Sequence, residues 1–193
     1  MDTIDLSGAL GLIAMVVLTL NIVMGILLST AYKKNAYWQK LPEKIKGLQI
    51  LDLHNYTAYV GLLIVFLHFI IIPLDPSSKF NFTHLLKPLT APHQPIFVLL
   101  GLLSFIAILI VIITTQKVIK QKLGANTWRN IHVISYATGL LFIVHGLFMD
   151  PLLKDRPIDF IDPEKLLVVA CGILLIAAFV FRYKYTIAKK RAV

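Results

Sequence analysis

The chain has 193 residues, of which 58% are apolar and only 15% are charged, and its mean hydropathy is +0.79. In soluble domains about a quarter of all residues are charged, so this composition excludes an ordinary soluble domain and indicates an integral membrane protein. The net charge of +9 does not indicate nucleic-acid binding, because the cations flank apolar runs. The single cysteine, Cys171, excludes an internal disulfide, a covalently attached c-type haem, an iron–sulfur cluster and a cysteine-based zinc site within this chain.

Five apolar runs are each long enough to cross the hydrocarbon core of a bilayer as an α-helix. The first run lacks a positively charged start and is too long for a cleaved signal peptide, so it is expected to be a membrane helix. The predicted fold is all-α: one transmembrane bundle over residues 1–193 without a soluble domain. The five spans are expected at about residues 7–31, 48–73, 95–115, 129–149 and 165–183.

The lysines and arginines predict how the bundle is oriented. Fourteen of them lie in the segments 32–47, 116–129 and 182–191, and five lie in the loops on the other side. The positive-inside rule then places the N-terminus outside and the C-terminus in the cytoplasm. The chain is therefore expected to be a multi-pass protein of the cell (inner or plasma) membrane. Its basic tail would contact anionic lipid or dock a cytoplasmic partner.

The second and fourth spans each contain two histidines. In LDLHNYTAYVGLLIVFLHFIII they are His54 and His68, and in WRNIHVISYATGLLFIVHGLFMD they are His132 and His145. Both spans run from inside to outside, so the four residues form two pairs at two depths, about 20 Å apart along each helix. An ionisable side chain in a membrane is costly, and four at matched depths indicate a function.

Haem iron suits such pairs because it accepts two neutral imidazoles as axial ligands, and the apolar porphyrin can pack between helices. A structural zinc site would need four ligands at one point. One geometric difficulty follows from helical periodicity. The fourteen residues from His54 to His68 nearly complete whole turns, whereas the thirteen from His132 to His145 leave the two side chains about 140° apart on a straight helix. The fourth span is therefore expected to tilt, bend or present its histidines from opposite flanks, with Gly139 and Gly146 as places for bending or close approach.

These two segments, with their H-x13-H and H-x12-H spacing and the WRxxH element, resemble the ferric-reductase-like transmembrane domain family. That family includes ferric reductases, NADPH oxidases and the haem-bearing membrane subunit of a periplasmic methionine sulfoxide reductase system. The resemblance covers roughly residues 48–183. It implies that His54 and His132 bind the iron of an inner, non-covalent b-type haem and that His68 and His145 bind the iron of an outer one. Arg129 would pair with a haem propionate or, alternatively, anchor the span at the inner surface.

The chain departs from many members of that family, which commonly have six spans and continue into a flavin- and nicotinamide-binding region. No GxGxxG motif is present here. The expected function is that of a di-haem b cytochrome that carries electrons across the membrane as a subunit of a larger oxidoreductase, between a donor and an acceptor protein. It would have no catalytic residues of its own.

Three alternatives remain open at this stage. One is a cytochrome b anchor subunit that oxidises quinol, with quinone as a further cofactor. Another is a transporter that uses its histidines to carry metal ions or protons. The third is a purely structural subunit of a larger complex.

Weaker signals lie outside the two histidine segments. His84 and His93 are expected to be ordinary loop residues or to border the outer haem. In the latter case Lys79, Lys87 and Arg156 are candidate propionate partners. Asn21, deep in the first span, is expected to form an interhelical hydrogen bond, with a quinone contact as the alternative.

Overall fold

The structure is a computed structural model and describes residues 3–150, 152–154, 156–159 and 161–191. In this part of the chain the regular structure is helical, without strands, and five helices are long and apolar enough to cross a membrane. The all-helical, multi-pass membrane class is therefore confirmed. In chain order the elements are α1 (Thr3–Ser29), η1 (Tyr32–Lys34), α2 (Ala36–Gln39), α3 (Glu43–Lys46), α4 (Ile50–Ile71), η2 (Ile72–Leu74), η3 (Pro76–Ser78), α5 (Phe82–Leu86), η4 (Pro88–Thr90), α6 (Pro95–Thr115), α7 (Lys117–His132), α8 (Ile134–Phe148) and α9 (Pro163–Arg191).

The boundaries of the first three spans agree with the sequence prediction to within four residues, and α6 begins and ends where expected. The fifth span differs most at its end, because α9 continues to Arg191, beyond the apolar stretch. The extension is polar and carries basic residues in its last turn, where cations interact favourably with the helix dipole.

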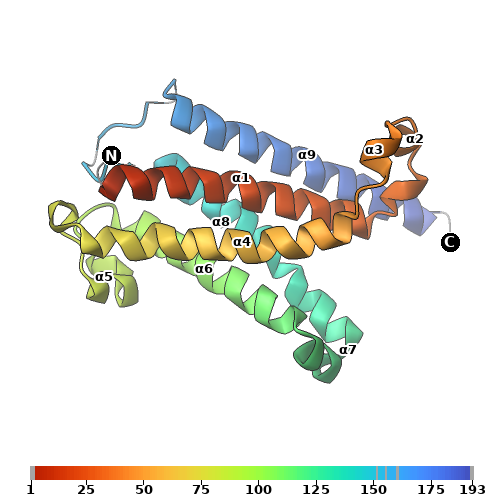
Figure 1. The fold of residues 1–193 in the computed structure, drawn as a ribbon, viewed down its shortest axis with the longest axis horizontal. Helices are drawn as coiled ribbons and strands as arrows, with labels where there is room; N and C mark the ends of the chain where they lie inside the picture. Colours follow the sequence, from red (N-terminus) through yellow and green to blue (C-terminus); the bar gives the residue numbers. More distant parts are fainter. Residues whose placement is uncertain (1–2, 151, 155, 160, 192–193) are drawn as a thin grey trace.

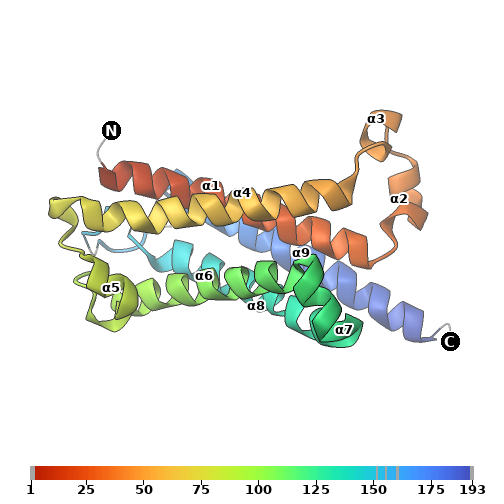
Figure 2. The same cartoon turned by 60° about the horizontal axis from the view of Figure 1, so that its bottom comes forward.

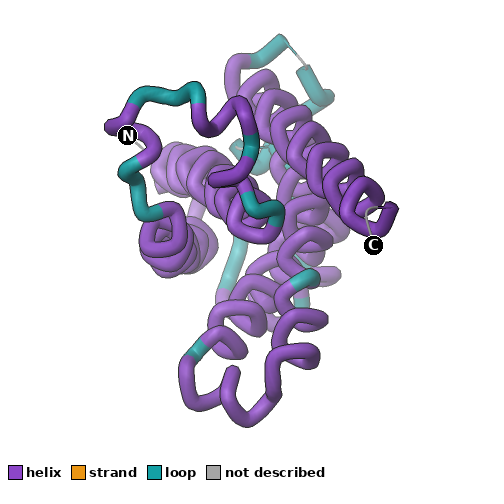
Figure 3. The backbone as a smooth tube through the Cα atoms, turned by 90° about the vertical axis from the view of Figure 1, so that its right-hand side faces the viewer, coloured by secondary structure: helices purple, strands orange, loops and turns teal. Residues whose placement is uncertain are grey.

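The two termini lie at opposite ends of an elongated bundle (Figure 1). We call the end that contains the N-terminus, α5 and the loop after α8 the amino-terminal end, and the opposite end, with α2, α3 and α7, the carboxy-terminal end. The three segments that hold fourteen of the nineteen cations all lie at the carboxy-terminal end (Figures 1 and 2). The charge asymmetry in the sequence is thus an asymmetry between the two ends of the molecule. Figure 3 shows the bundle along its long axis, with its helices side by side.

Helix packing divides the bundle into neighbouring pairs. α4 lies along α1, and α6 lies along α8, while α9 packs against both α1 and α8. The buried core is made by α1, α8 and α9. The core side chains of α1 and α9 recur every three or four residues and so form one stripe on each of these helices, and α8 contributes Phe142. The core residues are Met15, Leu18, Ile22, Ile26, Phe142, Val168, Cys171 and Leu175.

The fourth span is interrupted at two places. Gly124 has a positive φ of 75° and separates the basic start of α7 from the polar segment that leads to His132. A second break follows His132, where the amide of Tyr136 bonds the carbonyl of Val133 and the hydroxyl of Ser135 donates to the carbonyl of His132. Between the two histidines of this span, the irregular turn therefore lies at Val133, one residue after His132.

The two glycines of the fourth span allow close helix approach instead of bending. A Cβ atom on Gly139 would lie 2.9 Å from the Cδ1 atom of Ile22, and one on Gly146 would meet the end of the Met15 side chain. Both glycines face α1, so they let α8 lie closely against it.

Asp150 organises the loop after α8 at the amino-terminal end. Its carboxylate accepts hydrogen bonds from the backbone amides of Leu152, Lys154 and Arg156 and from the Arg156 guanidinium. Burial of Asp150 opposes ionisation, but these hydrogen bonds outweigh it and hold the pKa of Asp150 well below its ordinary value of 3.8. The ionised carboxylate is thus part of the folded loop.

Asp150→Asn is expected to lower the free energy of unfolding by about 1–2 kcal/mol at neutral pH, because it removes charge-assisted hydrogen bonds to a half-exposed arginine. Because the folded-state pKa is depressed, the stabilisation is present above the ordinary pKa and is lost as the pH falls through the folded-state value. Thermal unfolding in detergent should therefore give a lower unfolding temperature for Asp150→Asn than for the unaltered protein at pH 6, and this difference should narrow below about pH 4. The exposed Asp159→Asn is the matched control, and a gap that is independent of pH would contradict the prediction.

Candidate functional site

The four membrane histidines meet in the two pairs that their depths predicted. The rings of His54 and His132 have centroids 6.2 Å apart and planes inclined at 68°. The rings of His68 and His145 have centroids 6.3 Å apart and planes inclined at 78°. The first pair lies towards the carboxy-terminal end and the second towards the amino-terminal end. α4 contributes one ring to each pair, and the fourth span contributes the other.

Both separations suit two imidazoles that bind one metal atom from opposite sides. A metal–nitrogen bond is about 2 Å long and the ring centre lies about 1 Å beyond the nitrogen, so two such ligands in line have centroids about 6 Å apart. The helices that carry the rings pack along other helices, α4 along α1 and α8 along α6. The two spans thus approach each other mainly through these side chains.

Hydrogen bonds at Nδ1 fix the orientation of three of the four rings. Nδ1 of His68 lies 2.7 Å from the carbonyl oxygen of Ser7, that of His54 lies 3.0 Å from the carbonyl oxygen of Asn21, and that of His145 lies 2.7 Å from the carbonyl oxygen of Phe97. A carbonyl oxygen only accepts, so each Nδ1 carries the hydrogen and each Nε2 keeps its lone pair. Histidines that bind metals commonly donate the other ring N–H in this way.

His132 is the exception among the four. Its Nδ1 is buried and has no hydrogen-bond partner among the described residues, and the same holds for Nε1 of Trp128. The Trp128 ring lies 5.2 Å from the His132 ring, and the ammonium of Lys120 lies 3.8 Å above the Trp128 ring. This aromatic and cationic contact was not predicted from the sequence, although the four-residue spacing of Trp128 and His132 places them on one helix face.

Glycines lie behind the same three rings. A Cβ atom added to Gly25 would lie 3.2 Å from Cε1 of His54. One added to Gly11 would lie 3.0 Å from Cε1 of His68, and one added to Gly101 would lie 2.8 Å from Cε1 of His145. The backbones of α1 and α6 can approach the imidazoles this closely only because no side chain intervenes. Gly11 and Gly25 are fourteen residues apart, as are His54 and His68, and that match is the sequence signal that could have revealed them.

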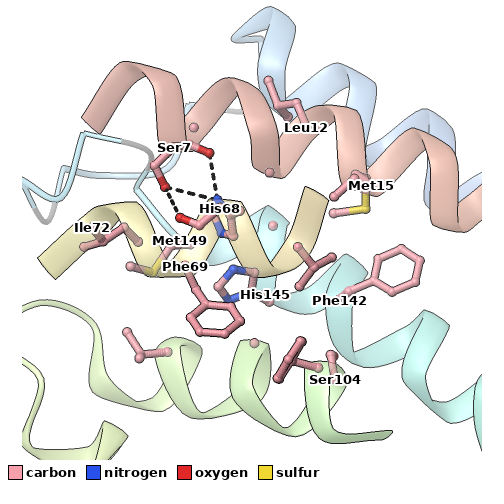
Figure 4. A pocket seen from close by; sticks show the side chains of 18 of the residues that line it. Ser7, Leu12, Met15, His68, Phe69, Ile72, Ser104, Phe142, His145 and Met149 are labelled. Carbon is pink, nitrogen blue, oxygen red and sulfur yellow. Dashed lines mark hydrogen bonds between the residues drawn. The ribbon is translucent and has the colours of Figure 1, made fainter. Parts of the chain in front are cut away.

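The His68–His145 pair lines an apolar cavity at the amino-terminal end (Figure 4). The cavity has a volume of about 180 Å³. Phe69 lies beside the imidazole of His145, Phe142 also lines the cavity, and the polar lining is confined to a few residues. Cofactor sites in helical bundles have this character, with apolar walls and a few oriented polar groups. The residues around this pair therefore fit an apolar macrocycle.

Lys165 of α9 lines the same cavity and is only 7% exposed. Its Nζ donates to the carbonyl oxygens of Gly146 at 3.0 Å and Met149 at 2.6 Å, which belong to the last turn of α8 and the residue after it. A cation is favourable where helix carbonyls lack intrahelical partners. Lys165 thus holds the end of the helix that carries His145, whereas the sequence showed it only as a flanking charge.

Of the other predicted residues, Asn21 contacts a histidine of the two pairs, whereas Arg156 and His84 have other partners. Arg129 is exposed and makes no hydrogen bond or ion pair with the part of the chain that the structure describes. Arg156 is engaged by Asp150. His84 accepts a hydrogen bond from the amide of Asn81 and caps α5. Asn21 forms the interhelical hydrogen bonds expected of it, from Nδ2 to the carbonyl of His54 at 2.6 Å and to the hydroxyl of Thr57 at 2.8 Å.

The loop histidines lie beside the aromatic residue that covers part of the cavity. The rings of His84 and His93 lie 5.8 and 6.4 Å from the ring of Phe80, which lines the cavity.

The described residues contain no group of three or more histidine, cysteine or acidic side chains that could hold a bare metal ion. Each histidine pair offers two nitrogen donors, so any metal bound there must bring most of its ligands with it, as haem iron does.

Comparisons of the chain with protein-family models, with curated proteins and with solved structures find no match. The functional assignment therefore depends on the geometry of the two histidine pairs.

Lys165→Met is expected to lower the free energy of unfolding by about 2 kcal/mol, because it leaves two α8 carbonyls without their charged donor. Denaturant titration in detergent, followed by circular dichroism, measures the loss. The exposed Lys184→Met on the same helix is the control and should change stability little. Equal effects of the two substitutions would show that the buried ammonium does not stabilise the end of α8.

Proposed function

We propose that the protein is a di-haem b membrane cytochrome that carries electrons across the membrane as one subunit of a larger redox system. The observation that supports it most directly is the pairing of four imidazoles at two depths, with ring centroids 6.2 and 6.3 Å apart. One such pair in a helical bundle could be a structural hydrogen-bonding contact. Two pairs, each with the spacing of axial iron ligands, favour two haems.

In this proposal His54 and His132 hold one haem, and His68 and His145 hold the other. When bound, the haem irons supply reversible one-electron chemistry. The protein contributes neutral imidazole ligands, the carbonyl acceptors that orient three of them, and apolar walls around the His68–His145 pair. Such ligation and burial set reduction potentials.

The direction and setting of the transfer belong to the same proposal. The cation-rich carboxy-terminal end would face the cytoplasm of a cell membrane, which makes the His54–His132 haem the inner one. Electrons would pass from a cytoplasmic donor to an acceptor outside, as the resemblance to ferric-reductase-like domains implies. Arg129, exposed at the carboxy-terminal end, would be available to a haem propionate or to lipid headgroups.

Oxidation of quinol is the second candidate for the electron source. The observation that favours it is the pair of buried ring nitrogens, Nδ1 of His132 and Nε1 of Trp128, that lack partners among the described residues. A quinone carbonyl is an acceptor that such donors would bind. Reduction of the purified protein by a quinol analogue, blocked by a quinone-site inhibitor, would identify quinol as the electron source.

Replacing each membrane histidine by leucine tests the two-haem arrangement. His54→Leu or His132→Leu is expected to remove one haem per polypeptide, and His68→Leu or His145→Leu the other, because each iron loses an axial ligand. Haem content per polypeptide and the dithionite-reduced absorption spectrum measure the losses. His84→Leu is the control and should leave both haems in place. A transporter or structural subunit would instead show no haem bands in the unaltered protein, which would end the cytochrome proposal.

The angles between the imidazole planes predict an electron paramagnetic resonance signature. At 68° and 78° the planes of each pair are closer to perpendicular than to parallel, so the two rings interact with different iron d orbitals to a similar extent. Both oxidised haems should therefore give low-spin spectra of strong axial anisotropy, each with one prominent low-field feature. Rhombic spectra with three well-resolved features would indicate parallel rings and contradict the observed geometry.

A further inference from the structure

The first helix contains two matched pairs of small or polar residues that face the histidines of α4. Ser7 and Gly11 form one pair, and Asn21 and Gly25 form the other. Residues four apart lie on one face of a helix, and the two pairs are fourteen residues apart. α1 and α4 are the first two of the five long helices and run side by side in opposite directions (Figure 1), so each pair meets one histidine.

The same set of contacts occurs twice. At the amino-terminal end His68 donates through Nδ1 to the carbonyl of Ser7, and the Ser7 hydroxyl donates back to the carbonyl of His68 at 2.7 Å (Figure 4). At the carboxy-terminal end His54 donates through Nδ1 to the carbonyl of Asn21, and the Asn21 amide donates back to the carbonyl of His54 at 2.6 Å. Any residue could supply the accepting carbonyl, but the returning bond requires a polar side chain at these two positions.

The glycines complete each arrangement. Gly11 lies behind the ring of His68 and Gly25 behind the ring of His54, so the backbone of α1 forms a flat support for each imidazole. Each imidazole donates a hydrogen bond from Nδ1, the backbone carbonyl of the same histidine accepts one, and a glycine lies against the ring. The ring therefore has little freedom to rotate. Its Nε2 lone pair is then directed away from α1, towards the fourth span.

We infer that α1 is the helix that orients both α4 ligands, with Ser7 as the positioning residue for the His68–His145 haem and Asn21 as the positioning residue for the His54–His132 haem. The inference rests on the proposed di-haem function and deepens it. Each reciprocal pair of hydrogen bonds holds one imidazole as the Nδ1–H tautomer and raises its basicity towards iron. A more basic ligand stabilises ferric iron, so each pair lowers the midpoint potential of its own haem.

Four substitutions on α1 test this assignment in the full-length protein. Ser7→Ala and Asn21→Leu remove the returning hydrogen bonds, and Gly11→Ala and Gly25→Ala press a methyl group against the rings. Redox titration should show that Ser7→Ala and Gly11→Ala shift only the midpoint of the haem that is lost in His68→Leu. Asn21→Leu and Gly25→Ala should shift only the other midpoint, and the electron paramagnetic resonance feature of the same haem should move in each case. Loss of the returning bond is expected to shift the midpoint upwards.

Two variants separate orientation from a general effect on folding. Ser7→Thr keeps the hydroxyl and should restore the unaltered midpoint. Thr19→Val removes a hydroxyl on α1 that is buried and has no partner among the described residues, and it should shift neither midpoint.

The outcomes distinguish this inference from the function on which it rests. Nitrogen NMR of the haem-free protein supplies a readout without cofactor. His68 and His54 should be Nδ1–H tautomers, and the Nδ1 resonance of His68 should shift in Ser7→Ala and that of His54 in Asn21→Leu, because the ring is held less firmly against its α1 carbonyl. Two bound haems with unchanged midpoints and spectra in all four variants would overturn the role of α1 and leave the cytochrome standing. An unaltered protein without haem would overturn both.

Discussion

The arrangement of the bundle depends on hydrogen bonds from imidazole Nδ1 groups to backbone carbonyls on neighbouring helices. Such a bond satisfies a polar group that would otherwise be costly in an apolar interior, and it determines which ring nitrogen remains free. α1 provides the carbonyls for the histidines of α4, and α6 provides the carbonyl for His145. Two helices without histidines therefore act as supports for the two spans that carry them, and the free nitrogens point inwards between those spans.

Much of this architecture follows from periodicity and composition. Apolar runs longer than the bilayer core predict five helices, and alternation of direction places His54 with His132 and His68 with His145. The same periodicity predicted that a straight fourth span could not direct both of its histidines to one side. The structure resolves that difficulty with a break at Val133, where the Ser135 hydroxyl takes the place of a backbone donor to the carbonyl of His132. The position of such a break depends on which backbone hydrogen bonds the packing of neighbouring helices leaves intact. The spacing of residues in the sequence therefore does not predict where the break lies.

Other features could not be predicted because they depend on the register between helices. Ser7 and Gly11 are ordinary residues of an apolar helix until α4 is placed against them at one particular axial offset. Lys165 has the sequence context of a flanking cation, and only the position of α9 beside the end of α8 makes it a buried donor. Arg129 remains exposed, so its pairing with a propionate stays a prediction, whereas the contact of Trp128, one residue earlier, with His132 was not predicted.

The two histidine pairs have different surroundings, and the differences bear on the proposed transfer of electrons. The His68–His145 pair has carbonyl acceptors on both rings, lies beside the buried ammonium of Lys165 and lines an apolar cavity. In the His54–His132 pair only one ring has such an acceptor, and the other contacts an indole that carries a lysine on its face. Ligand basicity, nearby charge and burial are the quantities by which a protein sets the potential of a haem. Two haems held in these surroundings would therefore have different potentials, and that difference would give electrons a preferred direction along the bundle.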